Sequence, residues 1–344
     1  MITSIAENNR KAFEEYILGH PESMFFHSYK YLYFLQELLQ VEPCHLIYSE
    51  NGSVKGVLPL LKKKGPWGIV YNSSPYYGSN GGVLADSGDI AGKLIQEYNK
   101  IISADGVLAS VWVENILASE SYSEKVSHNL TDYRIGQFTN IGFTENHAEN
   151  LMQAFHYKTR NMVRKSEKSG FEIKVNNAEL EFLKEVHKEN MSAIGGKAKS
   201  DAFFNFPDYF EADKDYKIWV AYLDGKPVAA MLLFYYRKTV EYYTPVIKEE
   251  FREKQPLSAL IFEAMKDASQ YGYNFWNWGG TWATQGGVYT FKKRWGTTDQ
   301  NYTYYIQLNN EELYGKSKEE ILQHYPDFFI VPFSLLKPQV KNEK

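Results

Sequence analysis

The feature that most constrains this chain of 344 residues is a weak internal repeat, in which the same order of short elements occurs twice. Each copy opens with two β-rich runs that flank an Asn-Gly or Asp-Gly pair, a pairing that favours the tight turn between antiparallel strands. The runs and turns are His45–Ser49, Asn51-Gly52 and Val54–Leu61 in the first copy, and Ile218–Leu223, Asp224-Gly225 and Val228–Tyr235 in the second. The repeat therefore predicts two similar units, each built on a hairpin.

Each copy then continues with a helix that ends near a glycine and leads into an apolar strand. The helices are predicted over Ile90–Ser103 and Leu257–Ser269, and the strands over Val107–Val113, Thr239–Val246 and Tyr273–Trp278. This order predicts an α/β (α+β) fold in which helices flank a mixed central sheet in each domain. We place the junction before a further helical segment, 149–169. The predicted organisation is 1–148 and 149–309 as domains and 310–344 as a C-terminal tail.

Charge and composition exclude several classes of protein. The formal net charge of −4 excludes a generally basic coat for nucleic acid, and we expect no DNA partner. No apolar run reaches the roughly eighteen residues that a membrane-spanning helix needs. Cys44 is the only cysteine, which suits a reducing cytosol, and the eight histidines form no metal-binding pattern. We therefore expect a cytoplasmic protein without a metal site.

Two motifs resemble those of the Fem family, the peptidoglycan-bridge aminoacyltransferases within the GCN5-related N-acetyltransferase superfamily. The first is the basic run from Lys158 to Gly170 (KTRNMVRKSEKSG), and the second joins Trp278-Gly279-Gly280 to the run from Gly286 to Gly296 (GGVYTFKKRWG). The resemblance implies two tandem acetyltransferase-like domains and the use of aminoacyl-tRNA as donor. The chain departs from the family at Asn277, where some members have Asp, and lacks a heptad-patterned arm.

The resemblance implies catalytic roles for Lys292 and Phe291, because the lysine of the family's FK motif is proposed to stabilise the reaction intermediate. Acyl transfer to an amine passes through a tetrahedral oxyanion, so a cation near the reacting carbonyl favours the transition state over the ground state. The alternative is that Lys292, Lys293 and Arg294 form a solvated run of charge.

The donor-binding residues are predicted on the basic segment. Arg160, Arg164 and Lys168 recur every four residues and share one helix face, with Lys158 nearby, so they could meet a phosphate backbone. A basic outer face of a surface helix is the alternative. Arg252 begins a stretch where coenzyme A-dependent relatives carry R-x-x-G-x-G/A. Here Gln255 and Pro256 interrupt that pattern, and a proline removes an N–H donor.

Five residues are acceptor-binding candidates: Tyr77 and Asn80 in a Gly-rich loop, Tyr243 in the middle of a strand, and Trp278 and Gly280 at a strand end. The resemblance places the counterpart of this loop beside the acceptor cleft. A plain turn is the alternative for the loop, and core packing is the alternative for the aromatic side chains.

These observations favour an acyltransferase that forms an amide on a cell-envelope precursor, by aminoacyl transfer from charged tRNA to a peptidoglycan precursor. A second hypothesis is a coenzyme A-dependent N-acyltransferase that acts on an amino sugar of a surface polysaccharide. A third is a non-catalytic double domain that binds a precursor or a carbohydrate. We expect no tightly bound cofactor, since the aminoacyl-tRNA or acyl-CoA is a co-substrate. Contact with a membrane surface follows if the acceptor is lipid-linked.

Overall fold

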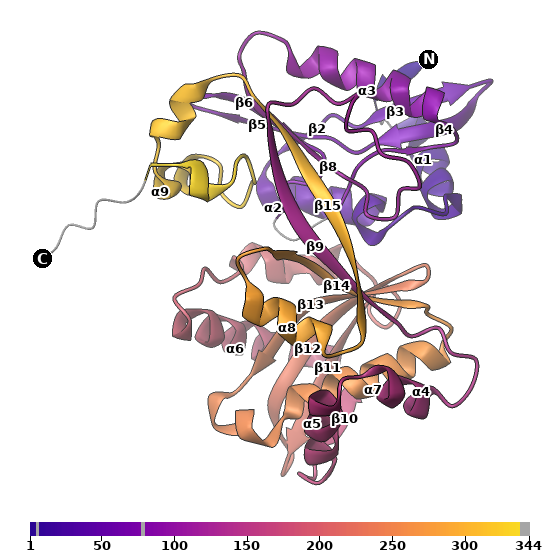
Figure 1. Cartoon of the computed structure of the whole chain (residues 1–344), viewed down its shortest axis with the longest axis vertical. Coiled ribbons are helices and arrows are strands. Elements are labelled where there is room, and N and C mark those ends of the chain that lie inside the picture. Colours follow the sequence, from indigo (N-terminus) through magenta and orange to yellow (C-terminus); the bar gives the residue numbers. More distant parts are fainter. Residues whose placement is uncertain (5–6, 77–79, 338–344) are drawn as a thin grey trace, which may run out of the picture. The chain divides into compact units, whose positions relative to one another are not determined.

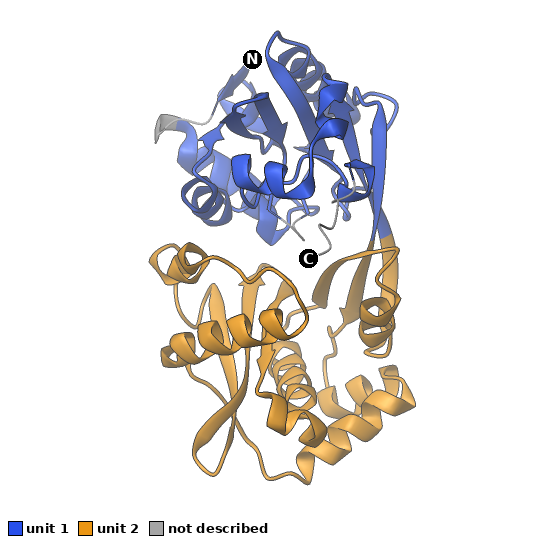
Figure 2. Ribbon diagram, turned by 90° about the vertical axis from the view of Figure 1, so that its left-hand side faces the viewer, with its two compact units in different colours: residues 1–134, 301–344 blue, residues 135–300 orange. Residues whose placement is uncertain are grey.

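The computed structural model describes residues 1–4, 7–76 and 80–337, and the chain divides into two compact units (Figure 2). Unit 1 comprises Met1–Arg134 and Asn301–Lys344, and unit 2 comprises Ile135–Gln300. Strands β9 (Leu130–Asn140) and β15 (Thr297–Leu308) carry the chain between them (Figure 1). No helix among the described residues is both long enough and apolar enough to cross a bilayer.

Unit 1 contains a small antiparallel sheet and a second, mixed sheet. The small sheet has the order β1-β3-β4-β7, and the strands of the other follow the order β15-β8-β6-β5-β2. The strands are β1 (Ile2–Ser4), β2 (Glu42–Pro43), β3 (Leu46–Glu50), β4 (Ser53–Leu58), β5 (Leu61–Gly65), β6 (Gly68–Asn72), β7 (Leu84–Ala85) and β8 (Val107–Val113). The helices are α1 (Glu7–Gly19), α2 (Tyr29–Leu39), α3 (Gly88–Ile102) and α9 (Lys318–His324).

Unit 2 is a mixed sheet with helices on its faces, in the strand order β10-β11-β12-β13-β14-β9-β15. Its own strands are β10 (Glu172–Val175), β11 (Tyr216–Leu223), β12 (Lys226–Tyr236), β13 (Thr239–Ile247) and β14 (Phe275–Trp282). The helices are α4 (His147–Ala154), α5 (Tyr157–Glu167), α6 (Leu180–Ala193), α7 (Pro256–Gln270) and α8 (Gly286–Lys293). Helices α4, α5 and α7 pack together, and α6 contacts β12 and β13.

The predicted hairpins are present in both units. Strand β3 pairs antiparallel with β4, and β11 with β12. Both residues of each turn, Asn51-Gly52 and Asp224-Gly225, have positive φ, as the tight hairpin turn requires. Each unit also contains one parallel pair bridged by a helix, which is β6-α3-β8 in unit 1 and β13-α7-β14 in unit 2. The predicted α/β class and its internal repeat are therefore confirmed.

Two predicted elements are each divided in the structure. The run 54–61 separates into β4 and β5 in different sheets, because Pro59 lies between them and cannot donate a ladder hydrogen bond. The helix predicted over 149–169 breaks at Phe155 and His156, which have extended backbone. The His156 amide donates to the Arg294 carbonyl at 2.9 Å instead of continuing the helix.

The unit boundaries also differ from the predicted domain limits. The units change over at 134/135 and 300/301, whereas the sequence placed the junctions at 148/149 and 309/310. Both observed changeovers lie inside the long strands β9 and β15, which carry no turn signal that a sequence could reveal. The C-terminal segment belongs to unit 1, where the side chain of Asn72 donates to the Phe329 carbonyl at 2.8 Å.

Candidate active site in unit 2

The side chain of Lys292 is the centre of the candidate site. It projects from the last turn of α8 against β14 and is 7% exposed. Its ammonium group donates to the Thr281 hydroxyl at 2.8 Å and to the carbonyl oxygens of Gly279 and Gly280 at 3.3 and 3.4 Å. No carboxylate among the described residues lies in ion-pair distance of this ammonium. Lys292 is therefore a buried cation with neutral partners, and the solvated-run alternative does not describe its surroundings.

Burial lowers the pKa of Lys292 from its usual 10.5 to about 8. Loss of hydration disfavours the charged form of an amine, and here no nearby anion offsets that loss. Its neighbour Lys293 is about half exposed and pairs with Asp299 at 3.2 Å, so the two lysines of the motif have opposite environments.

Other residues of the motif fix the position of α8. Phe291 packs edge-on against Trp278, with ring centroids 5.9 Å apart, and is 38% exposed. Gly296 has a φ of +74°, and a Cβ there would lie 2.7 Å from the Ala154 carbonyl oxygen. Only glycine fits that position, because an added methyl group would displace the end of α4.

The pairing between β14 and β13 ends just before the residues of β14 that hold Lys292. Strands β13 and β14 pair in parallel register from Thr239–Phe275 to Glu241–Asn277, where the register ends. Both strands continue, β13 to Ile247 and β14 to Trp282. The carbonyl groups that hold Lys292 therefore belong to the part of β14 that follows its last residue paired with β13.

A chain of hydrogen bonds joins Lys292 to a buried carboxyl group. The side-chain amide of Asn277 donates to Glu241 Oε2 at 2.7 Å, and its oxygen accepts the Gly279 amide at 2.9 Å. The Gly279 carbonyl in turn accepts from Lys292. Glu241 is 2% exposed, and burial raises its pKa from 4.5 to about 8. The chain sets the course of β14 through the turn at Gly279, whose φ is +71°.

The two hydrogen bonds of the Asn277 side chain, with Glu241 and with Gly279, give a physical reason for asparagine at this position, where some Fem-like proteins have Asp. An amide can donate to Glu241 and still accept from Gly279, whereas an ionised Asp could only accept. Sequence reasoning missed Glu241 and Gln137, which contacts Thr281 at 3.3 Å. A signal for Glu241 was present, because it is the only charged residue in the run 239–247.

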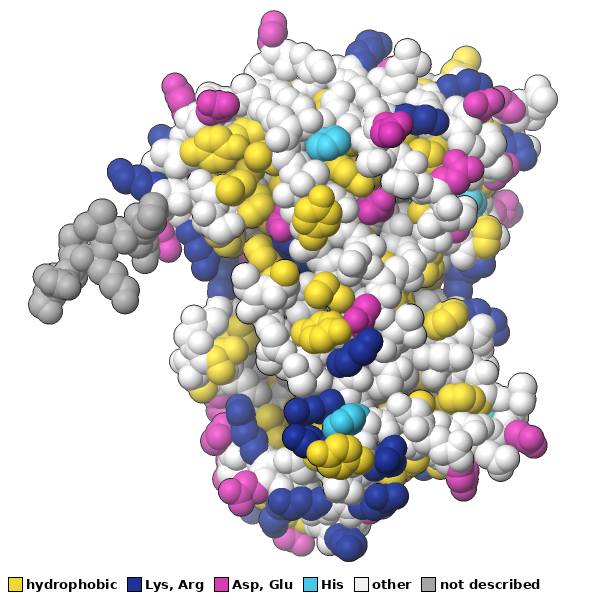
Figure 3. Space-filling model, in the orientation of Figure 1, with side chains coloured by type: hydrophobic (Ala, Val, Ile, Leu, Met, Phe, Trp, Pro, Cys, Tyr) yellow, Lys and Arg dark blue, Asp and Glu magenta, His cyan; other side chains and the backbone are white. Residues whose placement is uncertain are grey.

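The predicted donor-binding residues lie mainly on α5. Lys158, Arg164 and Lys168 are exposed and form no ion pair with a described residue. Arg160 is half-buried and donates to the Phe155 carbonyl at 2.5 Å, where it caps the end of α4. Figure 3 shows Lys and Arg side chains gathered on the surface that carries α5. A hollow of about 270 Å³ beside α5 contains Glu167 and Glu263, and these carboxylates disfavour phosphate there.

The loop before α7 offers few backbone donors. Arg252 pairs with Glu249 at 2.6 Å and is 45% exposed. The Gln255 amide donates to the Arg252 carbonyl, Pro256 has no N–H, and the Ser258 amide donates to the Gln255 carbonyl. Three of the positions that could cradle a pyrophosphate are thus engaged or lack a donor. Among the described residues, no group of three His, Cys, Asp or Glu side chains could hold a metal ion.

The acceptor-binding candidates fall into two groups. Tyr77 lies outside the described residues, and Asn80 is buried in unit 1 beside the Tyr302 hydroxyl. In unit 2, Tyr243 stacks on Phe203 with ring centroids 5.6 Å apart. Trp278 and Gly280 belong to the Lys292 site. The Trp278 indole donates to the Thr139 hydroxyl at 2.9 Å, and the Gly280 carbonyl accepts from Lys292. Trp278 is 2% exposed, which favours core packing of its ring.

Comparison with known proteins agrees with this architecture. Residues 153–293 match the family model of the acetyltransferase (GNAT) domain. The crystal structure of FemX is similar with a TM-score of 0.69 and 16% identity, over 89% of this chain and 97% of that chain. L-PGS from Bacillus licheniformis is similar with a TM-score of 0.54 and 14% identity, over 90% and 94% of the two chains.

A tandem GNAT protein from the clavulanic acid biosynthesis pathway has a TM-score of 0.50 and 8% identity, over 90% of this chain and 98% of that chain. Among the curated proteins, none matches the sequence. At these identities the solved structures show the fold alone. The resemblance predicted from the two motifs is confirmed in fold, as two tandem acetyltransferase-like units. The acyltransferase class is confirmed at the level of the matched domain family.

Proposed function

We propose that this acyltransferase joins an aminoacyl group from charged tRNA to an amine of a peptidoglycan precursor, with Lys292 stabilising the reaction intermediate. The observation that supports this role is a buried cation on α8 that no carboxylate of the described residues pairs with, held by the segment of β14 beyond its pairing with β13. A cation in such surroundings stabilises a developing oxyanion more strongly than one in water.

In the proposed reaction, the acceptor amine attacks the ester carbonyl carbon of the aminoacyl-tRNA. A C–N bond forms, the oxyanion collapses, and the C–O bond to the terminal ribose breaks. The proton released by the amine passes to the leaving oxygen or to water. The two long contacts of Lys292, at 3.3 and 3.4 Å, are those that a substrate oxygen can replace at least cost. Because charged tRNA is a cytoplasmic substrate, we propose that the reaction takes place there.

The donor is proposed to lie along the exposed cations of α5. Arg164 and Lys168 form no ion pair with a described residue, so the binding of phosphate would displace only counterions from them.

The double variant Arg164→Glu/Lys168→Glu is expected to weaken tRNA binding at least tenfold and to reduce its salt dependence. Filter binding at several salt concentrations measures both effects. Lys226→Glu, an exposed lysine at the hairpin turn of the same unit, is the control. Equal weakening in the control would assign the effect to net charge.

Acetyl-CoA and coenzyme A are expected to produce no thermal shift. A ligand present at a hundred times its dissociation constant adds about 2.7 kcal/mol of stability, which is readily seen. The engaged amides of the loop before α7 leave little to hold a pyrophosphate. A clear shift with either compound contradicts the proposed donor. It would favour the second candidate function, an acyl-CoA-dependent N-acyltransferase that acts on an amino sugar. The match of residues 153–293 to the acetyltransferase domain model is compatible with this candidate.

A direct test supplies purified protein with aminoacyl-tRNA and a peptidoglycan precursor and measures the mass of the product. Addition of one aminoacyl residue supports the proposal. Saturable binding of the precursor without any transferred group, using a donor series that includes acyl-CoA, would instead indicate a binding module.

A further inference from the structure

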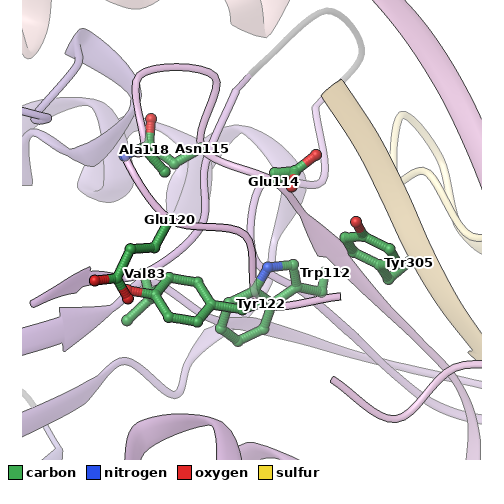
Figure 4. Close-up of a pocket in the computed structure, with 8 residues that line it drawn as sticks. All are labelled: Val83, Trp112, Glu114, Asn115, Ala118, Glu120, Tyr122 and Tyr305. Atoms are coloured by element: carbon green, nitrogen blue, oxygen red, sulfur yellow. The ribbon is translucent and has the colours of Figure 1, made fainter. Parts of the chain in front are cut away.

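Unit 1 contains a small hollow whose walls combine aromatic rings with carboxylate groups (Figure 4). Its lining residues are Val83, Trp112, Glu114, Asn115, Ala118, Glu120, Tyr122 and Tyr305. All of them belong to unit 1. The loop that follows β8 supplies most of the rim, and β8 and β15 supply the floor. Neither the proposed transfer reaction nor the predicted site residues use this hollow.

The rings form a firm wall. Trp112 and Tyr305 are 2% and 7% exposed, and Trp112 packs edge-on against Tyr98 with centroids 5.2 Å apart. Burial and the neighbouring Glu120 raise the pKa of Tyr122 to about 12, so its phenol remains neutral. The faces of Trp and Tyr rings attract cations through their quadrupole. Lys125 already approaches the Tyr122 ring at 5.9 Å.

The carboxylates give the hollow a negative charge. Glu114 Oε2 accepts the backbone amide of Thr303 at 3.0 Å, which fixes that side chain. Glu120 lies beside Gly88 at the start of α3, and a Cβ on that glycine would be 2.8 Å from Glu120 Oε2. Within the described part of the chain, neither carboxylate forms an ion pair with a lysine or arginine. Glu120 is exposed and accepts a hydrogen bond from the Tyr122 hydroxyl, yet no lysine or arginine of the described residues neutralises either charge, so both carboxylates favour a cationic ligand.

The size of the hollow selects the kind of cation. Its volume of about 10 Å³ corresponds to one water-sized group. The head of a primary ammonium is of that size and offers three donors to the surrounding oxygens. A trimethylammonium group is larger and has no N–H donor.

We infer that this hollow binds the primary ammonium group of a ligand. Carboxylates beside an ammonium favour its protonated form, and a protonated amine is not a nucleophile. The bound ammonium is therefore distinct from the amine that reacts in the proposed transfer, and the hollow is a recognition site. The inference does not depend on which acyl group the protein transfers.

The test is a chemical-shift titration of the full chain with n-butylammonium at neutral pH, followed at the backbone amides of Asn115 and Ala118. We expect saturable shifts with n-butylammonium and none with n-butanol or butyltrimethylammonium. Glu114→Gln and Glu120→Gln should each weaken binding about tenfold or more, because each removes one charge and keeps the shape of the side chain. Glu124→Gln, an exposed glutamate of the same loop, should leave the affinity unchanged.

Three results would overturn the inference. Equal shifts with n-butanol would identify a merely apolar crevice. Affinity that is unchanged in both Gln variants would exclude the carboxylates as the binding groups. Absence of saturable shifts in the unmodified protein, with its amide spectrum otherwise intact, would exclude a site. Since no readout involves acyl transfer, failure of the proposed function leaves these outcomes unaffected.

Discussion

Replacing Lys292 by methionine is expected to lower the rate of acyl transfer by about a hundredfold or more, the usual effect of removing one oxyanion donor. Methionine has a similar length and suits the buried position, so the protein should remain folded. Single-turnover measurements with the best donor would report the loss directly. Lys293→Met is the matched control, because that side chain is half exposed and pairs with Asp299. A normal rate in Lys292→Met would remove Lys292 from the mechanism.

The same substitution is expected to stabilise the protein near neutral pH. Burial lowers the pKa of Lys292 to about 8, so between pH 8 and 10.5 the unfolded chain binds more protons than the folded one. The stability of the unmodified protein should therefore rise with pH in that window, by about 3 kcal/mol if no other group intervenes. After the loss of the ammonium's hydrogen bonds, the net gain in Lys292→Met at pH 7 should be about 1–2 kcal/mol.

Chemical denaturation at pH 7 and pH 10 measures this change. The gain should shrink at the higher pH, where the amine of the unmodified protein is neutral in the fold. The rate of transfer should fall as pH rises above about 8, since the proposed role needs the charged form. If Lys292→Met is less stable than the unmodified protein at pH 7, the three hydrogen bonds of the Lys292 ammonium contribute more to stability than the burial of its charge costs.

The Glu241→Gln substitution is expected to have the second large effect, on the pH dependence of stability. Burial raises the pKa of Glu241 to about 8, so its neutral form favours the folded state. That contribution is fully present below about pH 4.5 and is lost as pH rises through 8. Glutamine stays neutral at every pH, so the variant should not lose stability as the pH rises. Its free energy of unfolding should exceed that of the unmodified protein by about 2–4 kcal/mol at pH 8.5, with little difference at pH 4.5.

Glutamine keeps an oxygen for the Asn277 amide, so the chain of hydrogen bonds to Lys292 should persist and transfer should stay within a few-fold of normal. Glu241→Leu removes that acceptor and is the contrasting variant, with a clear loss of rate expected. Denaturation curves at several pH values and single-turnover rates separate the two roles. Loss of transfer in both variants would instead make the Glu241 carboxyl a proton acceptor in the reaction.

The sequence by itself determined the repeated hairpins and the α/β class, because these depend on local chemistry. The choice of Lys292 rested on the resemblance of its motif to that of the Fem family, and its catalytic role stays a prediction. Asn-Gly and Asp-Gly pairs set the turns whatever surrounds them, and apolar periodicity set the faces of α3 and α7. The basic face of α5 followed from spacing alone. The departure at Asn277 was also visible in the sequence, although its reason was not.

Only the tertiary structure decided which charged groups are buried. Lys292 and Lys293 are neighbours in the chain, yet one is enclosed by β14 and the other pairs with Asp299 at the surface. Glu241 lies thirty-six residues from Asn277, and a hydrogen bond between them exists because α7 returns the chain to a parallel strand. Burial, and the pKa shifts that follow from it, depends on groups that are distant in sequence. No local pattern could therefore supply the electrostatics of the candidate site.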